Sequence, residues 1–142
     1  MYINSFMETE IEIVIQKLGN EGQKLKNLKT SLKIPKNSIN LAITHLSDNQ
    51  CLLGVVNDNS KKVLFFKIDF NFESGDKPPV VVTPLLDLKF HVEEASLLSV
   101  LNIEKDLVFI SKSPFTQSTR AFYVSRDLKL SWETEVVNEI RK

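Results

Sequence analysis

Apolar and polar residues alternate along most of this chain, and β-branched residues are frequent at the apolar positions. In the first such run, residues 10–18, isoleucine occupies every second position from 11 to 15. A period of two with β-branched side chains is the pattern of a half-buried β-strand. The turn Gly19–Gly22 leads into a second alternating run, residues 28–34, which Pro35 ends. Together these segments predict a β-hairpin.

The same pattern predicts further short strands, which polar turns separate. They are residues 39–43, 51–56, 63–70, 80–82, 86–90, 96–103, 107–110, 121–124 and 128–132. The run 51–56 is apolar throughout, which predicts a strand buried on both faces. Pro84 is expected to interrupt the chain between 80–82 and 86–90, because proline cannot donate to a ladder. Helical spacing of apolar residues in 133–142 predicts a tail or a docking helix.

The order of these elements recurs with an offset of about 55–59 residues. The first copy comprises Leu32–Ile34, Ile39–Ile43, Leu52–Val56 and Val63–Asp69. The second copy comprises Leu88–Phe90, Leu97–Leu101, Leu107–Ile110 and Ala121–Asp127. Repeats of this size indicate stacked units, because one unit cannot bury its own apolar face. We therefore expect an all-β fold in a single domain, residues 1–142. Its units are expected at about 10–34 (partial), 38–90 and 94–132, followed by the tail 133–142.

The segment Ser47–Asp58, followed by Lys62–Asp69, resembles the middle of a WD-repeat blade. In that family an Asp-containing turn precedes the second strand, and the third strand often ends in Trp-Asp. This chain keeps Asp69 but has Ile68 in place of the tryptophan, and it lacks the usual Gly-His pair. The resemblance implies antiparallel sheets arranged as two to three WD-type propeller blades. Closed propellers need about four to eight blades. Four interpretations of the chain therefore stay open: a fragment of a longer propeller, a shortened gene product, a half that another copy completes, or a different β-rich fold.

Within that group, Asn57–Phe66 followed by a second divergent blade is similar to the non-catalytic propeller subunit of the tRNA (guanine-N7) methyltransferase. This resemblance implies a non-enzymatic scaffold for protein–protein interaction in tRNA processing, in the nucleus or the cytoplasm. The expected partner is a catalytic subunit, and RNA is reached through that partner. We expect binding surfaces in the loops 47–50, 57–60 and 114–120.

Residues 24–68 also fit a winged helix-turn-helix, which would make the chain an α+β DNA-binding transcriptional regulator with a β-rich segment after it. Lys24–Leu32 would be its second helix, Ser38–Asp48 its recognition helix and Leu53–Ile68 its wing. The apolar residues of 39–46 have the spacing of one helix face. The basic residues that would then contact DNA phosphates are Lys24, Lys26, Lys29, Lys33 and Lys36. The same lysines also fit the solvated face of an exposed strand.

Composition adds few constraints. The formal net charge is zero, so no overall field attracts nucleic acid or membrane. Cys51 is the only cysteine, which excludes an intrachain disulfide and a cysteine metal cluster and favours plain core packing. The first residues lack a signal-peptide pattern and no apolar run is long enough to span a membrane, so we expect an intracellular protein. We predict no catalytic, cofactor-binding or metal-ligating residue, because His45 and His91 have no identifiable partners and the four glycines are scattered.

Overall fold

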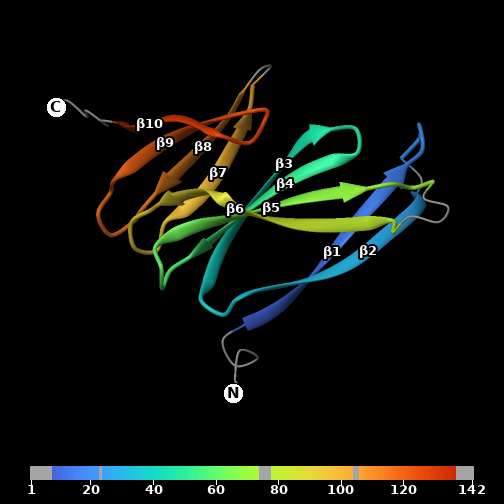
Figure 1. Ribbon diagram of the computed structural model, residues 1–142, viewed down its shortest axis with the longest axis horizontal. Coiled ribbons are helices and arrows are strands. Elements are labelled where there is room, and N and C mark those ends of the chain that lie inside the picture. Colours follow the sequence, from blue (N-terminus) through green and yellow to red (C-terminus); the bar gives the residue numbers. More distant parts are fainter. Residues whose placement is uncertain (1–7, 23, 74–77, 104–105, 137–142) are drawn as a thin grey trace.

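The computed structural model describes residues 8–22, 24–73, 78–103 and 106–136, which form ten β-strands and no helix (Figure 1). The all-β, antiparallel prediction is confirmed. The strands are β1 (Glu8–Leu18), β2 (Lys24–Pro35), β3 (Ser38–Ser47), β4 (Gln50–Asn57), β5 (Lys62–Phe70), β6 (Val80–His91), β7 (Leu97–Asn102), β8 (Asp106–Lys112), β9 (Thr119–Ser125) and β10 (Leu130–Val136).

The strands form three antiparallel sheets, each built from consecutive segments of the chain. β1 and β2 make a two-stranded ribbon, which crosses the β3–β6 sheet in Figure 1. The sheets β3–β6 and β7–β10 are both four-stranded, and in each the strands lie side by side in chain order. Short turns are sufficient for such neighbours, which explains why polar turn residues recur between the apolar runs.

The main hydrophobic core lies between the two four-stranded sheets. Four phenylalanine rings fill its centre, and all of them are at most 2% exposed: Phe65, Phe90, Phe109 and Phe122. Phe90 and Phe122 stack with ring centroids 4.1 Å apart, whereas Phe65 meets Phe90 and Phe109 edge-on at 5.0 and 5.1 Å. Gly54 lies at the same interface, where an added Cβ would stand 3.1 Å from side-chain atoms of Leu98 and Phe65. Glycine therefore lets the sheets approach closely at this point.

A second core lies between the β1–β2 ribbon and the opposite face of the β3–β6 sheet. Its buried members are Leu28, Ile34, Leu53, Val55, Phe66, Ile68 and Phe70. Because β4 contributes to both cores, its residues from Leu52 to Asn57 are all buried, and the prediction of a strand covered on both faces is confirmed.

Polar side chains join the two four-stranded sheets along their first strands, β3 and β7. The amide oxygen Oδ1 of Asn40 accepts a hydrogen bond from the backbone N–H of Leu98 at 2.9 Å. Further along, Nδ2 of Asn102 donates to the His45 carbonyl at 2.9 Å. Arg126 donates to Oδ1 of Asn102, to the Leu46 carbonyl on β3 and to the Ile103 carbonyl just after β7. Hydrogen bonds thus fix the β3–β7 line, and apolar contacts fill the core between the sheets.

The winged-helix interpretation is wrong, because both of its helices are strands. Lys24–Leu32 lies in β2, and Ser38–Ser47 is β3. A helix would place the apolar residues of 39–46 on one face. In the strand, Ala42 faces the main core, whereas Ile39 and Ile43 are exposed on the other face. The helical spacing of the apolar residues in 39–46 arises by coincidence, because residues from both faces of the strand together fit a helical period.

Two predictions of finer detail also fail. Residues 133–136 belong to β10 and pair with β9, so the predicted helix does not begin at Glu133; the rest of the predicted tail lies outside the described residues. Pro84 does not interrupt its strand, since β6 runs through it opposite Phe66 and shifts register only beyond Leu85. β6 is an edge strand, where a missing N–H is tolerated.

Candidate functional site

The five lysines singled out in the sequence are divided between different surfaces. Lys29 and Lys33 are exposed on the outward face of β2, and Lys36 is exposed in the following turn. Lys26 points to the other face, where its Nζ donates to the backbone carbonyl of Phe72. The side chain of Lys24 lies outside the described residues. The described lysines therefore do not form a single array for phosphate contact.

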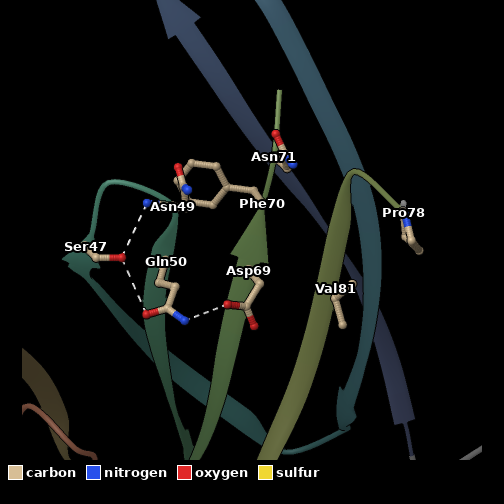
Figure 2. A pocket seen from close by; sticks show the side chains of 8 residues that line it. All are labelled: Ser47, Asn49, Gln50, Asp69, Phe70, Asn71, Pro78 and Val81. Carbon is tan, nitrogen blue, oxygen red and sulfur yellow. Dashed lines mark hydrogen bonds between the residues drawn. The ribbon is translucent and has the colours of Figure 1, made fainter. Parts of the chain in front are cut away.

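The predicted binding loop 47–50 lines a hollow of about 570 Å³ at one end of the β3–β6 sheet (Figure 2). The hollow lies between the β3–β4 turn, the end of β5 and the start of β6. Nε2 of Gln50 donates to Oδ1 of Asp69 at 2.7 Å. The hydroxyl of Ser47 lies 3.5 Å from Oε1 of Gln50 and donates to it. Figure 2 shows these three polar side chains directed toward one another.

This polar chain is suited to recognition by hydrogen bonding. An amide oxygen is not a base, so the contact with Gln50 does not activate the Ser47 hydroxyl as a nucleophile. The carboxylate of Asp69 is held by the same amide, which fixes its orientation. Among the described residues that line the hollow, no histidine or cysteine adds a general base or a second nucleophile.

The second predicted loop, 57–60, is occupied by internal contacts. The buried side chain of Asn57 accepts hydrogen bonds from the backbone N–H and the hydroxyl of Ser60, both at 2.9 Å. Oδ1 of Asp58 accepts from the backbone N–H of Ala95 at 2.9 Å, which ties this turn to the connection between β6 and β7. These residues stabilise the junction of the two sheets.

The third predicted loop, 114–120, is bonded to the rest of the protein at both ends and exposed between them. Its preceding residue Ser113 is fully buried and donates to the Glu94 carbonyl at 2.6 Å. At the other end, Arg120 forms an ion pair with Glu133 at 3.0 Å. Between them, Phe115 is 72% exposed. The loop is held at its base and presents one large apolar side chain to solvent.

The outer face of the β7–β10 sheet is apolar, and none of the residues that the structure describes covers it. Leu97, Leu101 and Trp132 are each more than half exposed on it. The ring of Trp132 stacks on Tyr123 of the neighbouring strand, with centroids 4.0 Å apart. Trp132 therefore lies on the outer face of the sheet and not in the core. Alternation alone cannot tell which face of a strand another sheet will cover, so the sequence did not mark this surface.

Cys51 is half-buried on β4 and lines a second hollow of about 690 Å³, which lies between β1 and β3. β1 contributes Val14 and Ile15 to this hollow, and β3 contributes Ile43 and His45. Desolvation by burial raises the pKa of the Cys51 thiol above its ordinary value. The thiol is therefore protonated and a weak nucleophile at neutral pH.

We expect iodoacetamide to alkylate Cys51 more slowly in the native protein than in urea at pH 8. The thiolate is the reactive form, and the raised pKa moves its formation to higher pH. The rate measured against pH should have its midpoint above that of the unfolded chain. Steric shielding alone would lower the rate at every pH and leave the midpoint in place, and that result would contradict the prediction.

No group of three or more metal-ligating side chains is found within residues 8–22, 24–73, 78–103 and 106–136. The described part of the chain also contains no helix long and apolar enough to cross a membrane. Comparison of the chain with protein-family models, with curated proteins and with solved structures gave no match.

Proposed function

We propose that this chain is a non-enzymatic interaction scaffold of propeller type, in which β3–β6 and β7–β10 are successive blades. Each sheet is four-stranded and antiparallel, with its strands in chain order. The sheets are joined by hydrogen bonds at their first strands, β3 and β7, which correspond to the inner strands of adjacent blades. This arrangement supports the sequence resemblance to WD-type repeats.

One observation carries the functional part of the proposal: the apolar face of β7–β10, which the described part of the chain leaves exposed. The stacked pair Tyr123–Trp132 provides a rigid aromatic centre, and Leu97 and Leu101 extend the surface toward the first strand. Exposed apolar surface with aromatic side chains is typical of protein–protein interfaces, where tryptophan and tyrosine often dominate the binding energy. The face is therefore proposed to bind a protein partner.

The narrower form of the proposal is that the partner is the catalytic subunit of a tRNA-modifying enzyme. Its support is the similarity of Asn57–Phe66 to the non-catalytic propeller subunit described above. Co-expression of the chain with such a catalytic subunit tests it directly. A complex that survives gel filtration supports the narrower form, and separate elution of the two proteins contradicts it.

The variant Leu101→Asp is expected to abolish partner binding while leaving the fold intact. Leu101 is 52% exposed on β7, the edge strand of this sheet, so the new carboxylate remains solvated in the free protein. In a complex, the same charge would be buried without a partner, which is strongly unfavourable. We expect at least about a 100-fold loss of affinity, the effect of a hot-spot residue, measured by tagged-protein capture and titration of the recovered partner.

Phe115→Asp is the matched control, because Phe115 is an exposed apolar residue outside the proposed face. The chain has a single tryptophan, so a blue shift of Trp132 fluorescence on titration reports burial of this face. A partner that tolerates Leu101→Asp, or that binds without changing this fluorescence, would contradict the proposed surface.

A further inference from the structure

The β1–β2 ribbon covers only part of the β3–β6 sheet. β2 lies near β6, so the uncovered part is on the side of β3. Leu41 and Ile43 of β3 are 47% and 56% exposed, although their cross-strand neighbours on β4, Val55 and Leu53, are buried. Ile39, two residues earlier, is 45% exposed. Within the described ranges, a stripe of three branched apolar side chains is thus left exposed beside a buried face.

β1 is the strand of the ribbon that lies on the side of this stripe, and one of its edges is unpaired in the described structure. Within the described residues, β1 pairs only with β2, in a register that is continuous from Glu8 to Lys17. Its other edge borders the hollow of about 690 Å³ that Ile43 and Cys51 line from the sheet below. An unpaired edge of this length offers main-chain donors and acceptors to an added strand.

The side chains of β1 define what such a strand must present. Ile11, Ile13 and Ile15 point toward the sheet and are half-buried, so inward residues of the added strand would meet an apolar surface. The outward face carries three exposed carboxylates, Glu8, Glu10 and Glu12. Only Glu10 lies directly opposite a lysine, Lys33 of β2. Outward lysine or arginine residues on an added strand would therefore be favoured as cross-strand neighbours.

We propose that the free edge of β1 binds a β-strand of a partner polypeptide in which branched apolar residues alternate with basic ones. The apolar side chains would cover the β3 stripe Ile39, Leu41 and Ile43, and the basic ones would face the β1 glutamates. β2 shows that this chemistry suits β1, because Lys29 and Lys33 alternate with buried Leu28 and Ile34 on its other edge. The inference concerns a different surface from the β7–β10 face and does not depend on it.

The test uses a capped peptide of about seven alternating valine and lysine residues, long enough to pair with most of β1. At low ionic strength it is expected to slow alkylation of Cys51, because a bound strand closes the hollow that this thiol lines. A peptide of alternating valine and glutamate should bind about tenfold more weakly or worse, since it sets like charges opposite one another. A lysine peptide N-methylated at alternate residues cannot pair its main chain and should give no protection.

Two matched variants of the protein locate the site. Ile43→Lys introduces a charge into the proposed contact, and Leu97→Lys introduces it into the far β7–β10 face, at 56% and 57% exposure respectively. The valine–lysine peptide should no longer bind the Ile43→Lys variant and should still bind the Leu97→Lys variant. The fluorescence of Trp132 should stay unchanged in all of these titrations. Equal protection by the lysine and glutamate peptides, protection by the N-methylated peptide, or no protection at about 1 mM peptide would each overturn the proposal. None of these results bears on partner binding at the β7–β10 face.

Discussion

Replacement of Phe109 by alanine is expected to lower the free energy of unfolding by about 3–5 kcal/mol, as for other buried phenylalanines. Phe109 is fully buried, with its ring 5.1 Å from that of Phe65 and 5.9 Å from that of Phe90. Truncation leaves a cavity between two sheets that hydrogen bonds hold at their first strands, so collapse around it is limited. Urea unfolding followed by far-ultraviolet circular dichroism measures the loss.

Phe115→Ala provides the control, because the same truncation at a 72% exposed position creates no cavity. Its effect should stay within about 0.5 kcal/mol, as at other surface positions. Similar losses for the two variants would mean that the aromatic cluster of Phe65, Phe90, Phe109 and Phe122 does not form the main core.

Replacement of Ile34 by alanine is expected to destabilise the attachment of the β1–β2 ribbon by about 2–5 kcal/mol. Ile34 is 3% exposed and is one of two buried side chains that β2 contributes to the second core. The ribbon pairs with no other strand in the described structure, so these side chains hold it against the β3–β6 sheet. Native-state hydrogen exchange should show faster exchange of the β1 amides, while the β8 amides keep their protection.

Lys33→Ala, at the neighbouring exposed position, is the matched control and should leave exchange in β1 nearly unchanged. If Ile34→Ala accelerated exchange equally in β1 and β8, the ribbon would be part of a single cooperative unit with both sheets, and the prediction of local opening would be wrong.

The strand pattern was readable from the sequence because most strands alternate strictly and polar turns separate them. β4 is the clearest case, since its unbroken apolar run correctly predicted burial on both faces. The ambiguity between helix and strand at residues 39–46 came from Ala42 and Leu46, which supply a helical period on top of the two-residue one. Pairing with β4, which depends on residues far from this segment, decides it.

The candidate surfaces were harder to predict than the strands. The alternating Ile39, Leu41 and Ile43 resemble a core face, yet the small side chain of Ala42 is the one that meets the neighbouring sheet. Which face of a strand becomes covered depends on how whole sheets stack, and no local pattern contains that information. The loop 47–50, predicted as a binding surface, lines a hollow, whereas the loop 57–60 supports the junction between the sheets.

The contact between the two four-stranded sheets is divided into a polar line at β3–β7 and an aromatic and aliphatic region beyond it. Cooling weakens burial of apolar surface much more than it weakens hydrogen bonds. On approach to cold denaturation, contacts in the aromatic and aliphatic region should loosen first, while the hydrogen bonds of Asn40 and Asn102 keep β3 and β7 together. Low temperature would in this way expose the Phe90–Phe122 stack before any strand is lost.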